Sequence, residues 1–485
     1  MKPRRVYLLP VALFALSGCS LNSTVDSSSV SSSIPSSEPT SSSSLSISSS
    51  EEPAKALDPY AEPMLGRQYY LNHIGDIFGA WQQYTGKGVT IAVIDVGFKP
   101  NHPEFTKADG TSKISDKSAA FAWNSSTDTV TRTDGVAAVY NEGESHGTFC
   151  AGVAAAAANG TGTIGIAPDA ELMLLKTDCR PKSIVQAFYH AANNGAKVIT
   201  ISIGSYYNYG RDLGLEPYQD LKDDGSDLGT VFDAAVKACY DKGIPVISAA
   251  GNGGLDGHPT EFTFPGCVDY VIGVGGLAAN SSSAIWDGSS YNPSPEWVLV
   301  DAVAPADGMY GPCHHSGLLY QGGWRGTSFA SPIVAGMAAL YYEAHPDHNA
   351  QDFADALKNS CIPFTPEGGT PKANQIGWGR VDVGALLGIS SRAVQVRCKS
   401  SWANMNAYYW NSKTGASGPS WPGKALTKQG NVFSVDIPAG YDSMILNDGS
   451  RKSVDLHPGS FNGDVTYNLV NSITENGVYV GSYER

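Results

Sequence analysis

Positive charge is scarce in this chain of 485 residues. Lys and Arg total 32 against 46 Asp and Glu, which gives a formal net charge of −14 at pH 7. A negative protein surface is repelled by the phosphate backbone, so nucleic acid is not expected as a partner. A charge of this sign suits an exported enzyme instead.

Several sequence patterns are also absent. No internal repeat period is visible, no Cys or His spacing is typical of a zinc site, and no acidic loop has EF-hand spacing. The apolar run Val6–Leu16 is too short to cross a bilayer as a helix. The length and the 42% apolar content leave room for two or more domains with ample core.

One segment with clear chemical potential is Gly326-Thr327-Ser328, which runs into the apolar stretch Ile333–Leu340. A serine at the start of a buried helix lies beside free backbone N–H groups and the positive helix end. These stabilise a developing oxyanion. Because an ordinary Ser/Thr helix N-cap has the same local pattern, a catalytic serine needs partners elsewhere in the chain.

Three other segments supply such partners. The segment Val89–Gly97 is an apolar run of strand length that ends with Asp95 and a glycine, and an acid at the carboxyl end of a buried parallel strand is well placed for chemistry. His146 opens an alanine-rich helix pattern, and Asn252 follows a buried strand pattern among glycines. Taken singly, the three also fit a turn residue, a core histidine and a turn asparagine.

Taken together, the order Asp, His, Asn, Ser resembles the subtilisin-like serine proteases, or subtilases. The resemblance covers about residues 60–390. Four further segments match typical subtilase sequences: Leu71–Gly75 leading to Gly86–Gly88, Ile164–Pro168, and Gly377–Asp382. It implies an α/β protein with a subtilisin-like three-layer fold, in which helices flank a mainly parallel sheet.

The resemblance also implies a role for each of the four residues. Ser328 is expected to attack the scissile carbonyl, and His146 to accept its proton and return it to the leaving amine. Asp95 orients the imidazole, and Asn252 stabilises the oxyanion. Three positions differ from the residues that are usual in the sequence motifs of the family, namely Val96, Phe149 and Ile333. None of them removes a proton-transfer or oxyanion group.

By the same resemblance, substrate binding is expected between two strand ends. One wall comprises Ser202, Ile203 and Gly204, and the other Ala249, Ala250 and Gly251. Such walls pair with the substrate backbone, and neither carries an acid. Apolar or broad P1 specificity is therefore expected, with protein or peptide substrates.

No cofactor is required for this chemistry, but structural calcium is considered at two places. The loop Ala158–Gly162 aligns with a subtilase loop that often binds calcium. The second place is an acidic loop with Asp220, Asp223, Asp224 and Asp227, for which a solvated surface loop is the simpler interpretation.

The N-terminal region has the pattern of an export signal. A basic start precedes the short apolar run, and Leu16-Ser17-Gly18-Cys19 resembles a bacterial lipobox, in which Cys19 is lipidated. An ordinary signal peptide with a chance cysteine is the alternative. Residues 20–55 are rich in serine and are expected to form a flexible spacer. The expected location is the cell envelope or surface, on a bacterial membrane through the lipid anchor.

Seven cysteines remain besides Cys19, and Cys150 lies four residues after His146, where proteinase K-like relatives keep an unpaired thiol. The other six allow up to three disulfides, with Cys239–Cys267 one candidate, or they are reduced core residues.

From Ala393 the pattern changes to short alternating runs between Gly, Asn and Ser turns, which predicts a small β-sandwich. It resembles a starch-binding carbohydrate-binding module. Tyr408, Trp410 and Trp421 are candidates for a sugar-binding platform, although Tyr408 and Trp410 also fit a sandwich core.

The predicted domains are a signal peptide (1–19), a linker (20–55), a peptidase domain (56–390) and a carbohydrate-binding-like module (393–485). The chain is expected to be a monomeric, exported serine endopeptidase that also takes a starch-like glycan. The competing hypothesis is a surface binding protein on a subtilase scaffold that has lost turnover.

Overall fold

The computed structural model describes most of the chain from residue 59 onward. The described residues are 59–206, 227–255, 257–260, 263–292, 298–314, 317–366, 375–389, 394–411, 415, 417–438, 441, 443–456, 465–473 and 478–484. The predicted signal peptide with Cys19, the serine-rich linker, and Asp220, Asp223 and Asp224 of the acidic loop lie outside these residues. Within the described residues no helix is long and apolar enough to cross a membrane.

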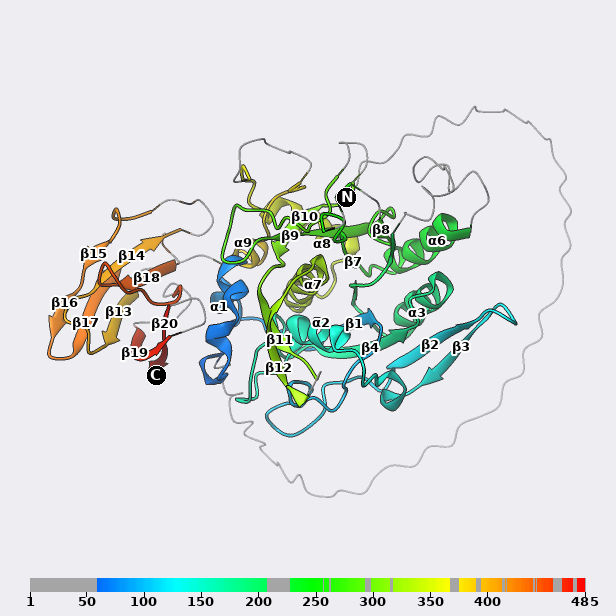
Figure 1. Ribbon diagram of the computed structural model, residues 1–485, viewed down its shortest axis with the longest axis horizontal. Helices are drawn as coiled ribbons and strands as arrows, with labels where there is room; N and C mark the ends of the chain where they lie inside the picture. Colours follow the sequence, from blue (N-terminus) through cyan, green and yellow to red (C-terminus); the bar gives the residue numbers. More distant parts are fainter. Residues whose placement is uncertain are drawn as a thin grey trace, which may run out of the picture. The chain divides into compact units, whose positions relative to one another are not determined.

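A central sheet of eight strands organises the larger part of the chain (Figure 1). Its order is β10-β9-β7-β5-β1-β4-β2-β3, and every neighbouring pair is parallel except β2–β3. The strands are β1 Thr90–Asp95, β2 Ala119–Asn124, β3 Thr129–Asp134, β4 Glu171–Thr177, β5 Val198–Ile201, β7 Val246–Ala249, β9 Val271–Leu277 and β10 Ala302–Pro305.

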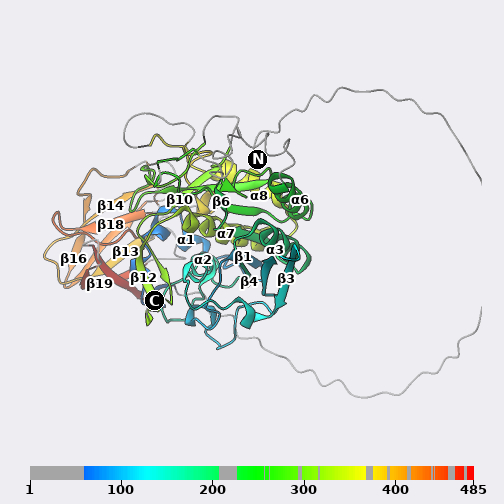
Figure 2. The same cartoon turned by 45° about the vertical axis from the view of Figure 1, so that its right-hand side comes forward.

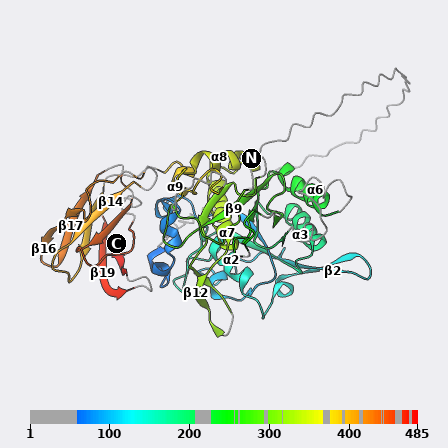
Figure 3. The same cartoon turned by 45° about the horizontal axis from the view of Figure 1, so that its top comes forward.

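Helices cover both faces of this sheet. They are α2 His146–Ala155 and α7 Thr327–Ala344 on one face, and α3 Pro181–Asn193 and α6 Asp227–Asp241 on the other. Strand β1 shows why, because Ile91 and Val93 enter the first apolar cluster while Ala92 and Ile94 enter the second. A strand buried on both faces in this way is typical of a parallel sheet between helices. The predicted three-layer α/β fold is confirmed (Figures 2 and 3).

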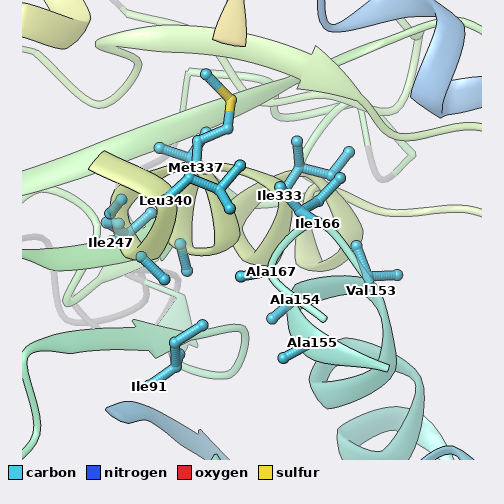
Figure 4. Packing of buried hydrophobic residues seen from close by; sticks show 14 of the residues in the cluster. Ile91, Val153, Ala154, Ala155, Ile166, Ala167, Ile247, Ile333, Met337 and Leu340 are labelled. Atoms are coloured by element: carbon cyan, nitrogen blue, oxygen red, sulfur yellow. The ribbon is translucent and has the colours of Figure 1, made fainter. Parts of the chain in front are cut away.

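The helix α7 is buried along nearly its whole length. Ile333, Met337 and Leu340 of α7 share one apolar cluster with Ile91 and Ile247 of the sheet and Val153 of α2 (Figure 4). Small residues permit the close approach: a Cβ on Gly336 would lie 2.9 Å from the carbonyl oxygen of Ala154 in α2. Each fully buried aliphatic side chain contributes about 1.5–3 kcal/mol, so the core fixes the start of α7 firmly.

The remaining elements of this part are short. They are η1 Pro59–Ala61, η2 Leu65–Arg67, η3 Tyr69–His73, α1 Ile77–Ala80, η4 Pro103–Phe105, η5 Val136–Val139, β6 Ser205–Tyr206, β8 Thr263–Phe264, β11 Met309–Pro312, β12 Tyr320–Trp324, α8 Ala350–Ser360 and α9 Val383–Leu386.

The C-terminal part is an all-β module with its own apolar core, which includes Val396, Phe433 and Leu446. Its strands are β13 Val394–Lys399, β14 Asn406–Trp410, β15 Lys424–Ala425, β16 Thr427–Gln429, β17 Val432–Ile437, β18 Ser443–Asn447, β19 Val465–Ile473 and β20 Tyr479–Glu484. They form two sheets, β16-β17-β13-β19-β20 and β15-β14-β18, and β13–β19 is the parallel pair among antiparallel ones. The two sheets share one core, as predicted for a sandwich.

Candidate active site

Three adjacent strands end at one edge of the central sheet and bring distant segments together. In the order β7-β5-β1, the first is followed by Asn252, the second by Ser202, and the third ends on Asp95. The carboxyl edge of a parallel sheet is where α/β proteins assemble their sites. The starts of α2 and α7 add His146 and Ser328 to this edge.

Asp95 and His146 form a hydrogen-bonded pair. The imidazole Nδ1 lies 2.9 Å and 3.0 Å from the two carboxylate oxygens of Asp95, which is fully buried. The backbone N–H of His146, the first residue of α2, donates to Glu144 Oε1 (2.9 Å). The next residue is Gly147, and a Cβ there would lie 2.4 Å from the Gly97 carbonyl oxygen. Only glycine permits this approach of α2 to the β1 end.

The pair has a marked electrostatic consequence. Burial lowers the pKa of His146, but the negative charge of Asp95, the neighbouring Cys150 and the hydrogen bonds that the imidazole makes with both outweigh this, and the pKa is raised well above its usual value. The imidazole keeps 22% of its side-chain surface exposed, so a substrate can reach it. Such a group can accept a proton and hold the resulting charge.

Ser328 is the second residue of α7 and is 7% exposed. Its Oγ donates a hydrogen bond to the Ser202 carbonyl oxygen (3.1 Å). The hydroxyl is therefore bonded to a backbone oxygen and not to the imidazole in this structure; catalytic hydrogen bonds often form only when substrate binds.

A proline inside α7 explains how the backbone of Ser328 is held. Pro332 has no N–H, so the carbonyl of Ser328 lacks its helical hydrogen bond. Ser202 Oγ donates to that oxygen instead (2.7 Å), and so does Cys150 Sγ (3.4 Å). The backbone carbonyl of Ser328 is therefore held by two side chains that come from other elements.

Asn252 is oriented by the residue that precedes the serine. Its Oδ1 accepts hydrogen bonds from Thr327 N (2.9 Å) and Thr327 Oγ1 (3.0 Å). Since the oxygen is committed to Thr327, the amide nitrogen is presented as a donor. This nitrogen lies over Gly326, whose Cβ would be only 3.5 Å away. The geometry places an N–H donor beside the turn that leads to Ser328.

In the C-terminal module, three aromatic rings gather on one face. Tyr408 and Trp410 alternate along β14 with the buried Ala407 and Tyr409. The Tyr408 ring lies 5.8 Å from Trp410 and 5.6 Å from Trp421 between centroids, and Trp421 is 51% exposed. The rings form a partly exposed surface, not the sandwich core.

The loop that carries Trp421 is held against β14 and β18 by a hydrogen bond and a glycine. Asn447 Nδ2 donates to the Pro422 carbonyl oxygen (2.8 Å), which ties the loop to β18. Gly423 has φ +102°, and a Cβ there would lie 2.1 Å from the Ala407 carbonyl oxygen. Proline and glycine thus allow the tryptophan to lie against β14.

Comparison with known proteins agrees with both parts. Residues 86–379 match the Subtilase family, and residues 394–457 match Starch-binding module 26. Subtilisin DY of Bacillus licheniformis is 28% identical over 288 residues, which are 58% of this chain and 86% of that protein. Subtilisin E of Bacillus subtilis is 29% identical over 287 residues, again 58% of this chain but 62% of that protein. The chain belongs to the subtilase family.

Solved structures show the same fold. A protease from Pseudoalteromonas arctica has a TM-score of 0.51 and 22% identity, covering 68% of this chain and 99% of that one. Fervidolysin from Fervidobacterium pennivorans, described as a keratinolytic enzyme related to subtilisin, has a TM-score of 0.51 and 19% identity, covering 84% of this chain and 60% of that one. The family's members are serine endopeptidases that need no cofactor for catalysis.

The predicted substrate walls of this subtilase are only partly formed by side chains. Ile203, Gly204 and Ala249 are accessible, but Ala250 is fully buried in the core. The Ser202 side chain points to α7, where it bonds Ser328 O and Ser331 Oγ (3.0 Å). Gly251 donates its N–H to Thr327 Oγ1 (3.0 Å). Ser202 and Gly251 therefore hold the Thr327–Ser328 segment, whereas Ala250 packs in the core.

Two buried carboxylates escaped the sequence-based interpretation. Glu62 accepts hydrogen bonds from Gly160 N (2.7 Å) and Gly162 N (3.3 Å), and Glu104 Oε1 from Thr163 N (2.6 Å). Both therefore face the loop that was aligned with a calcium-binding loop. Burial raises the pKa of Glu104 to about 7, although the hydrogen bonds from Thr163 act to lower it. Lying far apart in sequence, the two acids show no local motif.

No disulfide joins any two of the cysteines among the described residues. Cys239 is fully buried on α6 and its Sγ donates to the Phe188 carbonyl oxygen (3.7 Å). Cys239 and Cys267 both lie in the apolar cluster of the outer helices. The predicted Cys239–Cys267 disulfide is thus not formed, and the alternative of reduced core residues describes them.

Proposed function

We propose that Ser328 is the nucleophile of this subtilase, with His146 as its base, Asp95 as the orienting carboxylate and Asn252 as an oxyanion donor. The observation that carries this assignment is the Asp95–His146 pair beside the start of α7, with Asn252 locked by Thr327. Every group needed for acyl transfer comes from a strand end or a helix start of the rigid core.

The steps follow from the positions of these groups. Ser328 Oγ attacks the scissile carbonyl carbon while His146 takes its proton, and the charge that develops on the carbonyl oxygen is stabilised by Asn252 Nδ2. His146 returns the proton to the leaving amine as the peptide bond breaks. Water then attacks the acyl-enzyme by the same route, which releases the acid and restores Ser328.

The test is a comparison of Ser328→Ala with the wild-type chain on denatured casein. The variant is expected to lose on the order of 10⁶ in kcat, because removal of the nucleophile of a triad abolishes the covalent route. A serine-directed phosphonate should inactivate the wild type. Equal, phosphonate-insensitive rates for both proteins would instead support a binding protein on a subtilase scaffold.

For substrates, we propose protein chains with an apolar or unrestricted P1 residue. The accessible wall positions Ile203, Gly204 and Ala249 carry no charge. Backbone pairing gives affinity without strong side-chain choice. Cleavage sites in a digested denatured proteome should lack a preference for basic P1 residues. Enrichment of Lys or Arg at P1 would contradict this proposal.

We further propose that Glu62, Glu104 and the Asn159–Thr163 loop hold a structural calcium ion. The fit rests on two neighbouring buried acids and on Glu104 Oε2, a buried oxygen without a hydrogen-bond partner among the described residues. Calcium takes several oxygen ligands and neutralises such acids. A chelator should lower the melting temperature of the wild type but not that of Glu104→Gln. Equal melting temperatures of the wild type with and without chelator would refute the site.

The C-terminal module is proposed to bind a starch-like glycan through Tyr408, Trp410 and Trp421. Partly exposed rings on one face suit stacking against sugar rings. Ser328→Ala protein, chosen to prevent self-digestion, should be retarded in native gels that contain soluble starch. Unchanged mobility with starch and other glycans would reject this role.

Export and lipid attachment at Cys19 are proposed from the sequence Leu16-Ser17-Gly18-Cys19 after a basic and apolar start. Lipid would tether the enzyme to the membrane. In a bacterial host, labelled fatty acid should enter the wild-type chain and not Cys19→Ala. Equal labelling, or none, would rule this attachment out.

A further inference from the structure

Three aromatic side chains form a closed cluster beside the catalytic histidine. Phe149 lies on α2, Trp324 ends β12, and Phe329 directly follows Ser328 on α7. Ring centroids are 4.7 Å apart for Phe149–Phe329, 5.0 Å for Phe149–Trp324 and 5.6 Å for Trp324–Phe329. We call these three residues the aromatic triad; each member contacts the other two.

The aromatic triad reaches the reacting imidazole through one member. The Phe329 ring lies 5.6 Å from the His146 ring, at an interplanar angle of 49°. Phe149 lies one helical turn after His146 on α2, so its ring supports Phe329 from the helix that also carries the histidine. Phe149, one of the three positions that depart from the family pattern, thus acts on the His146 ring through Phe329.

His146 needs support beyond its hydrogen bond. Asp95 holds the Nδ1 edge, but a single edge contact leaves the ring free to rock about that bond. Phe329 and Phe149 are 2% and 0% exposed, so both are fixed by the core. A Cβ on Gly311 of β11 would lie 3.0 Å from the Phe149 ring, so the hairpin backs the cluster from behind. A rigid ring beside the imidazole limits this motion.

The contact also has an electrostatic side. During turnover His146 carries a positive charge, and aromatic rings attract cations within about 6 Å of their centroid. The Phe329 ring lies inside that range. Trp324 is half-buried, and its ring packs edge-on against Phe329 at an interplanar angle of 89°.

We propose that Phe329, supported by Phe149 and Trp324, is a positioning residue that fixes the plane of the His146 imidazole and stabilises its protonated form. This proposal rests on the role of His146 proposed above. It assigns the aromatic triad a kinetic function in addition to its packing.

The test replaces Phe329 with an apolar side chain that is not aromatic. For Phe329→Leu we expect kcat to fall about tenfold with KM changed less than twofold, because the bound substrate is unaffected while the base is misplaced. The acid limb of the kcat/KM profile should move about 0.5 pH unit lower, since the protonated imidazole loses an attractive ring. Phe329→Tyr, which keeps the ring, should restore most of kcat.

Phe188→Leu is the matched control. Phe188 is also a fully buried phenylalanine, but it lies on α3 in the other apolar cluster. Its replacement should lower the melting temperature and leave the acid limb and kcat unchanged. If Phe329→Leu behaves like Phe188→Leu in all these measurements, Phe329 is only a core residue and the proposal is wrong.

Trp324→Leu keeps the proposal testable should Phe329→Leu fail to fold. As a half-buried rim residue, Trp324 can be changed at less cost to the core, and kcat should fall about threefold with the limb shifted in the same direction. An unchanged kcat and acid limb would count against the aromatic triad. Failure of the proposed catalytic role of Asp95, His146 and Ser328 is distinguishable from failure of the aromatic triad, because it would appear as phosphonate-insensitive activity in the wild type.

Discussion

The active-site edge of the central sheet and the aromatic face of the C-terminal module are built on opposite plans. At the sheet edge, Asp95 is 0% and Ser328 7% exposed, and each is held by hydrogen bonds from other elements. On the module, Trp421 is 51% exposed and its ring is placed by packing and a tied loop. Chemistry demands fixed geometry, whereas stacking on a sugar tolerates small displacements.

This difference predicts how each region responds to mutation. In the proposed mechanism the residues at the sheet edge act as a unit, so losing one disables the others and effects should be large and non-additive. On the module each ring contributes its own contact area, so effects are smaller and closer to additive.

Asp95→Asn should produce the largest loss short of removing the nucleophile. An amide at this position favours the wrong imidazole tautomer, so kcat is expected to fall about 10⁴-fold with the fold intact. The measurement is kcat on a soluble peptide, with the circular dichroism spectrum as a control for folding. A loss smaller than tenfold would mean that the hydrogen bond at Nδ1 is dispensable.

Asn252→Ala should lower kcat roughly 10²–10³-fold, because the oxyanion loses one donor while the substrate still binds. KM is expected to stay within a few-fold of the wild-type value. The matched control is Asn292→Ala, because Asn292 Oδ1 bonds the backbone N–H groups of Leu299 and Val300 away from the site. That variant should lose stability rather than kcat. Equal kcat losses in both would remove the basis for an oxyanion role.

Trp421→Ala should weaken starch binding about tenfold, the size of effect typical of a well-placed aromatic contact, and leave peptidase activity unchanged. Trp402→Ala is not a suitable control because that ring is buried in the module core. Tyr140→Ala, an exposed aromatic change on the peptidase part, should leave starch binding as it is. A wild-type starch affinity for Trp421→Ala would place the glycan elsewhere.

The pH dependence is the smallest effect. The pKa of His146 is raised by Asp95 beyond the lowering by burial, and the neutral imidazole is the form that accepts a proton. Activity should therefore be lost as pH falls through a value above the ordinary histidine pKa of about 6.5. A profile of kcat/KM between about pH 5 and 10 measures this limb. An acid limb well below pH 6 would contradict the raised pKa.

The sequence was sufficient for the fold class and for bringing the four catalytic candidates to one edge. Asp95, Asn252 and Ser202 each end or follow an apolar run, and adjacent parallel strands collect such ends without further information. The order of strands in the sheet is a long-range property that no local pattern contains.

Side-chain direction was beyond the sequence-based interpretation. Ser202 and Ala250 were assigned to substrate walls, yet one side chain bonds α7 and the other fills the core. Glu62 and Glu104 were missed because their partners are backbone N–H groups of a third segment. The Cys239–Cys267 disulfide failed for a related reason, since sequence gives the number of thiols but not the directions in which they point.

The order of the four catalytic candidates along the chain has a consequence for biosynthesis. Asp95, His146 and Asn252 leave the ribosome before Ser328. Strand β5 lies between β1 and β7 in the sheet, so it must pair with both before the strand ends that carry Asp95 and Asn252 are held together. Domains fold as units once their chain is complete. A growing chain therefore has no complete candidate site until α7, the last helix of that site, has entered the core.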